Sequence, residues 1–167
     1  MNDILMIRTA ELEDLNAIGY LAYQIWPTAY KDILSFERLH YMLQHFYSPS
    51  ALKEQMLSKQ HIFLLAENSE DEPVGFASYS EIEKNIFKLH KLYVLPAIQG
   101  KNIGKTLMEV VEEECRESGG KKLLLNVNRF NKAIQFYEKL GFKIIKEEDV
   151  DIGNGIVQED YVMEKAL

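Results

Sequence analysis

The sequence predicts an α/β protein with a mixed, mostly antiparallel sheet that carries helices on both faces. Three patterns support this class: helical periodicity in the first third of the chain, strand-like runs after residue 60, and a strand–helix–strand segment that indicates one parallel crossover. The 167 residues fall within the ~100–200 that one domain usually has, so we expect residues 1–167 to form a single domain.

The first third of the chain is predicted to be helical after one short strand. Residues 4–8 are typical of a strand, and Thr9 is expected to cap a helix that runs to about Trp26. Apolar residues at helical spacing predict a second helix over residues 35–46 and a third from Pro49 to about residue 57.

From residue 61 onwards, strands and helices alternate. Apolar and β-branched runs between turn residues predict strands over residues 61–67, 74–83, 86–95, 123–127, 142–146 and 157–163. Helical spacing predicts helices over residues 104–118 and 131–140, and Gly141 is a natural left-handed C-cap for the second. Asn154-Gly155 favours a tight turn between the last two strands.

Composition excludes several classes of protein. The net charge of −7 argues against general DNA or RNA binding, which needs a basic surface. The single cysteine, Cys115, allows neither an intrachain disulfide nor a multi-cysteine zinc site, and the histidines lack metal-ligand spacing, so we expect no metal. No apolar run is long enough to span a membrane and the first residues show no signal-peptide core, so we expect a cytoplasmic protein without a membrane partner.

Charge is distributed unevenly along the chain. Residues 101–146 hold ten Lys and Arg against six Glu, a local +4, whereas residues 147–167 hold seven acids against one Lys, a local −6. These segments are either solvated faces without function or sites for an anionic and a cationic ligand, respectively, and charge alone does not choose between them.

The segment 89–111 carries the clearest chemical signal. A strand ends at Pro96, a loop containing Gly100 and Gly104 follows, and a helix begins at once. Small residues and free N–H groups at a helix start favour an anion, although an ordinary strand-to-helix turn is the alternative. The loop is not a Walker A motif, because three residues separate its glycines, and no G-x-G-x-x-G is present; we expect neither ATP nor NAD.

Two motifs resemble those of the GNAT (Gcn5-related) N-acetyltransferases. Leu92-Tyr93-Val94, Pro96 and the run Gln99–Gly104 resemble the acyl-CoA-binding motif of that family, except that Asn102 stands where the family usually has Gly. Asn tolerates the left-handed conformation, so the turn can still form. The run Asn131–Phe142 resembles a second family segment, Asn-x-x-Ala-x-x-Phe-Tyr-x-x-x-Gly-Phe.

The resemblance implies a fold, a donor and a binding site. It implies a central sheet of six to seven strands with splayed central strands, an acyl-CoA-binding core over residues 86–142 and a helical acceptor side over residues 10–58. Acetyl-CoA would be the acyl donor, attacked directly by an amine in a ternary complex, with no metal. The residues it assigns to the donor are Leu92, Tyr93, Val94, Gln99, Gly100, Lys101, Asn102, Ile103, Gly104, Lys105, Asn131 and Tyr137.

Three residues have competing interpretations in the chemistry. The resemblance makes Tyr137 the general acid for the leaving thiolate, although its helical spacing also fits a buried core tyrosine. Glu81 is the first choice for a general base, against the commoner interpretation of an exposed strand glutamate; His90 is a weaker candidate. Asn131 either binds the pantetheine amides or caps the helix beside it.

The acceptor is expected to be a small basic amine. Trp26 and Tyr30 would form an aromatic wall, and Glu81 and the acidic closing hairpin would attract a cation with a methylene chain. The helices and motifs are together similar to bacterial polyamine acetyltransferases, which suggests a polyamine. The alternatives are an acetyltransferase for protein N-termini or lysines, and a non-catalytic acyl-CoA-binding sensor. A homodimer is compatible with the family, and no nucleic-acid partner is expected.

Overall fold

A computed structural model describes residues 5–98 and 101–167. The strands of this part of the chain are β1 (Met6–Thr9), β2 (Ile62–Glu67), β3 (Pro73–Glu83), β4 (Ile86–Val94), β5 (Lys122–Asn128), β6 (Lys143–Asp151) and β7 (Val157–Ala166). The helices are α1 (Leu15–Ala29), α2 (Phe36–Tyr47), α3 (Pro49–Leu57), α4 (Ile103–Glu117) and α5 (Ala133–Lys139), with short 3-10 turns η1 (Leu12–Asp14) and η2 (Pro96–Ile98).

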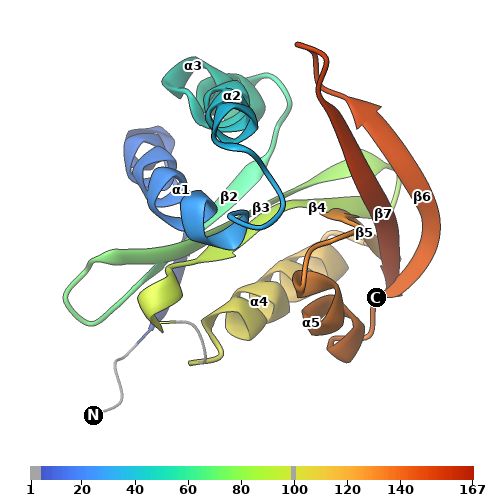
Figure 1. Cartoon of the computed structure of the whole chain (residues 1–167). Coiled ribbons are helices and arrows are strands. Elements are labelled where there is room, and N and C mark those ends of the chain that lie inside the picture. Colours follow the sequence, from blue (N-terminus) through green and yellow to red (C-terminus); the bar gives the residue numbers. More distant parts are fainter. Residues whose placement is uncertain (1–4, 99–100) are drawn as a thin grey trace.

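The strands form one mixed sheet with helices on both faces, as the sequence predicts. Its order is β1-β2-β3-β4-β5-β7-β6, and only the β4–β5 pair is parallel among the strands described. Helices α1, α2 and α3 cover one face, and α4 and α5 cover the other (Figure 1). None of the helices in the described ranges is long and apolar enough to cross a membrane.

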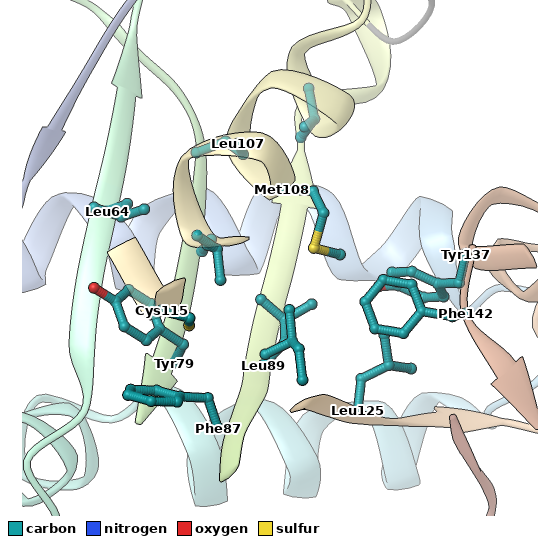
Figure 2. Packing of buried hydrophobic residues seen from close by; sticks show 14 of the residues in the cluster. Leu64, Tyr79, Phe87, Leu89, Leu107, Met108, Cys115, Leu125, Tyr137 and Phe142 are labelled. Atoms are coloured by element: carbon teal, nitrogen blue, oxygen red, sulfur yellow. The ribbon is translucent and has the colours of Figure 1, made fainter. Parts of the chain in front are cut away.

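Successive residues of the central strands bury side chains on opposite faces. In β2, Leu64 and Ala66 pack in the cluster under α4, whereas Phe63 and Leu65 pack against α1. Both faces are therefore apolar, which explains why these strands are nearly continuous hydrophobic runs. Figure 2 shows the α4-side cluster, in which Cys115 is fully buried. Burial raises the pKa of its thiol to about 12, so it is an inert core residue.

The two central strands separate halfway along their length. β4 pairs with β5 only from Ile86 to Leu89, opposite Lys122–Leu125. β5 continues to pair with β7 as far as Asn128. The register of β3 with β4 jumps from Ser78–Lys91 to Tyr79–Leu89, which leaves an extra residue, a β-bulge, in β4 at this point. The splayed strands that the resemblance implies are confirmed.

Two sequence predictions of element ends were wrong. Thr9 does not cap a helix: it is the last residue of β1, and the following turn is closed by a capping box of Glu11 and Asp14. The first helix continues beyond Trp26 to Ala29 because Trp26 is buried and its ring packs on Tyr30, one turn further.

The closing strands are longer than their apolar residues predict. β6 runs to Asp151 rather than residue 146, because its charged residues stay exposed at the sheet edge while the backbone pairs with β7. The predicted turn is present: Asn154 and Gly155 both have positive φ, 56° and 72°.

Candidate active site

The separation of β4 from β5 opens into a cavity of about 830 Å³. It lies between the acceptor-side helices, the two strands, the β6–β7 hairpin and the first turns of α4 and α5. Most of the residues predicted from the sequence line it: Trp26, Tyr30, Leu92, Tyr93, Val94, Asn102, Ile103, Gly104, Lys105, Asn131 and Tyr137. The fold therefore brings together the two motifs and the aromatic helix, which are far apart in the chain.

Four other predicted residues are not among those that line the cavity. Gln99 and Gly100 fall outside the described residues, and Lys101 is exposed and does not line the cavity. Glu81 is exposed on β3 and lines a separate hollow of about 470 Å³ with His61 and other residues. The structure does not bring Glu81 together with Tyr137.

The start of α4 has the geometry of an anion site. Asn102 adopts the left-handed conformation, with φ 60° and ψ 20°, so it substitutes for the glycine usual in the family, as predicted. Its carbonyl accepts the Thr106 N–H at 2.9 Å, the first bond of the helix. The N–H groups of the first turn and the exposed Lys105 then border the cavity with positive potential.

Tyr137 lies on α5, which packs beside the start of α4, at the edge of the α4-side cluster. Its ring packs edge-on against Phe136 and Phe142, with centroids 5.3 and 5.9 Å away, and Figure 2 shows it beside Phe142. Its hydroxyl has no hydrogen-bond partner within the described part of the chain, and burial raises the pKa of the phenol. The side chain is therefore a protonated donor that is held by its ring and free at its oxygen.

Aromatic side chains form the acceptor-side wall. The Tyr30 and Tyr93 hydroxyls lie 2.8 Å apart and share a hydrogen bond, while the Trp26 ring contacts both tyrosine rings at 4.6 and 5.7 Å. Burial raises the pKa of Tyr30 to about 12 and also raises that of Tyr93. The wall is thus a rigid, neutral cluster that joins α1 directly to the donor strand β4.

A pair of carboxylates forms the far end of the cavity. Glu148 of β6 lies opposite Asp160 of β7 in the register, and both line the cavity. The Asn126 amide donates to both, at 3.1 and 3.2 Å. Asp160 is only 6% exposed, and burial raises the pKa of its carboxyl group. Sequence reasoning recognised the acidity of this hairpin but missed Asp160 and Asn126.

The hairpin is held over the cavity by two contacts. The Tyr41 hydroxyl of α2 donates to the Ile152 carbonyl at 2.9 Å. On the other side, the Arg129 guanidinium donates to Asp149 at 2.6 Å, so this carboxylate is engaged outside the cavity. The acceptor side is therefore a walled pocket.

A basic group was also missed by sequence reasoning. Lys91 is only 7% exposed, and its amine lies over the rings of Phe46 and Tyr47, at 5.9 and 5.2 Å from their centroids. Beside it, His90 shares a 2.7 Å hydrogen bond with Ser80. Burial lowers the pKa of His90 to about 2, so this candidate base is neutral and binds a proton only weakly.

The Asn131 side-chain oxygen accepts the N–H of Ala133, the first residue of α5, at 2.8 Å. Asn131 lies one residue before the N-cap position, at Lys132, and it also lines the cavity. Within residues 5–98 and 101–167, no group of three or more metal-binding side chains is found.

Comparisons with known proteins agree with this geometry. Residues 31–165 match the model of the acetyltransferase (GNAT) domain. A spermidine N(1)-acetyltransferase of Thermoplasma acidophilum is 31% identical over 159 residues, which cover 93% of this chain and 96% of the relative. The crystal structure of the PaiA N-acetyltransferase from Thermoplasma acidophilum, in complex with coenzyme A, superposes with a TM-score of 0.84 at 30% identity, covering 98% and 99% of the two chains. A GCN5-related N-acetyltransferase from Rhodopseudomonas palustris has a TM-score of 0.83 at 22% identity over 100% and 99% of the chains, which shows the same fold.

Proposed function

Because the chain belongs to the GNAT acetyltransferase family, we propose that it transfers an acetyl group from acetyl-CoA to a primary amine of a small basic acceptor, of the polyamine class. The observation that carries the proposal is the walled cavity at the β4–β5 separation, with a free phenol on one side and a carboxylate pair at its far end. The relative of known acceptor and the neighbour with bound coenzyme A support it.

The donor fits the basic side of the cavity. After Leu89, the residues of β4 line the cavity instead of pairing with β5, and the pantetheine arm would lie along Leu92–Val94 as an added strand. The start of α4, from Asn102 to Lys105, would hold the pyrophosphate through helix N–H groups and lysine charge. Acetyl-CoA supplies the acetyl group as an activated thioester.

The residues of the chain then have defined roles. A backbone N–H of the separated part of β4 would stabilise the charge that develops on the carbonyl oxygen during attack. Tyr137 donates a proton to the departing sulfur, and its phenol is fully protonated at neutral pH. Its ring packing against Phe142 keeps the hydroxyl in position.

The acceptor fits the acidic end. Two neighbouring carboxylates, bridged by only one amide, favour a bound ammonium group over an empty site, because their mutual repulsion is relieved by a cation. Aromatic faces such as those of Trp26 and Tyr30 suit the methylene chain between two amines. A diamine or polyamine therefore places one nitrogen at Glu148 and Asp160 and presents another to the donor.

A peptide acceptor is disfavoured by the contact between Tyr41 and Ile152, which closes the side where a peptide groove would run. A protein that only binds acyl-CoA does not need the proton donor that Tyr137 provides.

The experiment is thiol release from acetyl-CoA by the purified protein, with spermidine, diamines, amino acids and short peptides as acceptors and a no-acceptor control. We expect release with spermidine and diamines at least tenfold above that with peptides. Equal turnover of polyamines and of amines with neutral side chains contradicts the acceptor class. No release, with acetyl-CoA still raising the melting temperature, favours the sensor alternative.

A further inference from the structure

Lys91 is a buried amine in the cavity without an acidic partner. It lines the cavity and is 7% exposed, yet in the described part of the chain no carboxylate lies within ion-pair distance of its nitrogen and no group hydrogen-bonds to it. Lysines are almost never buried unless they are paired. Its amine lies over the rings of Phe46 and Tyr47, whose centroids are 5.9 and 5.2 Å away.

The described groups around Lys91 are neutral or positively charged. They are Tyr47 of α2, Gln55 of α3, Lys59 and His61 of the connection between α3 and β2, Ser78 of β3, and Lys88 and His90 of β4 itself. The two imidazoles stack at 3.8 Å, and burial keeps both neutral at pH 7, since it lowers the pKa of His61 to about 4 and of His90 to about 2. Burial, helped by the charge of Lys59, likewise lowers the pKa of Lys91 to about 7.

The position of Lys91 points it at the acceptor. Because of the bulge in β4, Lys91 and Tyr93 face the α2 side while Leu89 faces α4. Two strand residues span about 7 Å, so the Cα atom of Lys91 lies one side-chain repeat along β4 from that of Tyr93, whose hydroxyl shares a hydrogen bond with Tyr30. Tyr137 lies near enough to raise the pKa of Tyr93 by charge repulsion. The amine is thus next to the acceptor wall and on the same cavity as the proton donor.

We propose that the neutral amine of Lys91 is the general base that takes a proton from the ammonium group of the acceptor, an inference that rests on the proposed acetyl transfer. The Lys91 nitrogen bonds to that proton and the acceptor becomes a neutral amine. The nitrogen of the acceptor amine forms a bond to the acetyl carbon while the carbon–sulfur bond of the thioester breaks. The sulfur receives the Tyr137 proton, the phenol regains one from the newly acylated nitrogen, and Lys91 loses its proton to water, so one proton is released per turnover.

This role resolves a conflict of charge in the cavity. A protonated Lys91 would repel a polyamine that Glu148 and Asp160 attract, whereas a neutral amine both tolerates the cation and removes its proton. General bases of this kind contribute about 10²–10⁴-fold to rate. Glu81, in its separate hollow, is not placed for this task.

The test uses Lys91→Met, which keeps the length and packing of the side chain without the amine, and Lys91→Arg, which keeps a charge that cannot be removed. At pH 7.5 we expect kcat/KM with spermidine to fall about 10²-fold in both variants. In Lys91→Met the loss shrinks towards pH 10, where the acceptor amine loses its own proton. Lys53→Met, an exposed lysine of α3, is the matched control and keeps wild-type activity. Acetyl-CoA should still raise the melting temperature of each variant.

A second readout does not depend on turnover. In protein labelled with ¹³C-lysine, the Lys91 resonance is identified as the one missing from the spectra of Lys91→Met and Lys91→Arg. In the wild-type protein this resonance should titrate near pH 7. A midpoint near 10.5 overturns the proposal, as does recovery of activity in Lys91→Arg or a Lys91→Met rate within threefold of wild type. Absence of acetyl transfer by the wild-type protein to any amine overturns the proposed function instead, and this inference with it.

Discussion

Replacing Tyr137 with Phe removes one hydroxyl and nothing else from the cavity wall. The ring contacts with Phe136 and Phe142 are unchanged, so the acyl donor should bind as before. Loss of a general acid costs about 10²–10⁴ in rate, which corresponds to about 2.7–5.4 kcal/mol at 1.36 kcal/mol per tenfold. Because the hydroxyl makes no hydrogen bond in the described structure and borders the cavity, its removal should change the free energy of unfolding by less than about 1 kcal/mol.

The assay pairs thiol release with urea unfolding, and Tyr79→Phe is the matched control. Tyr79 is 4% exposed in the α4-side cluster, and its hydroxyl donates to Glu114, outside the cavity. Its Phe variant should lose about 1–3 kcal/mol of stability and keep its rate. Tyr137→Phe should therefore lose rate and keep its stability, whereas Tyr79→Phe should lose stability and keep its rate. A Tyr137→Phe enzyme within threefold of wild-type kcat would refute the assignment of the proton donor.

Four further outcomes follow from particular contacts. Glu148→Gln and Asp160→Asn should each raise KM for spermidine about tenfold, because one charged contact contributes about 1.5 kcal/mol. KM for a monoamine should stay unchanged, and equal effects on both acceptors contradict the ammonium site. Tyr41→Phe removes the bond to the hairpin tip and should raise the same KM about fivefold, with acetyl-CoA affinity as the unchanged control. Asn102→Ala should lower the free energy of unfolding in urea by about 1 kcal/mol, because Ala adopts φ 60° at a higher energy than Asn. Asn102→Gly should not lower it. Lys91 has a folded-state pKa of about 7 against 10.5 unfolded, so the unfolded state binds more protons between these values and wild-type stability rises with pH there. Lys91→Met should thus exceed wild type by about 3–5 kcal/mol at pH 6 and match it near pH 10.5; a constant gap contradicts the buried neutral amine.

The donor side of the site could be predicted from the sequence because it depends on consecutive residues. The turn at Asn102 and the helix after it are adjacent in the chain, and their backbone conformation follows from local preferences. The same holds for Asn131 and Tyr137, which lie at a fixed spacing just before and within one short helix, α5. A motif of this kind is visible before the fold is known.

The acceptor side could not be predicted in the same detail. Glu148 and Asp160 belong to different strands, and their pairing depends on the register of a hairpin whose charged residues resemble a loop. From the sequence, Glu81 is the first choice for a base because it lies late in the strand beside β4, where the family resemblance places a carboxylate, but in the structure its side chain is exposed and lines a separate hollow. Whether a carboxylate faces a cavity is decided by sheet register, which composition does not contain.

The sequence by itself determined the class of fold, the order of its elements and the backbone turn for an acyl donor, since these follow from periodicity and from short-range conformational preference. Only the tertiary structure decided which groups line the acceptor side of the cavity. Strict alternation along β4 would put Leu89 and Lys91 on the same face of the sheet. A single bulge between them turns Lys91 to the other face, into a cavity lined by segments that are distant in the chain. Burial among aromatic rings then changes the proton affinity of that amine, because desolvation depends on all the neighbours that the fold assembles.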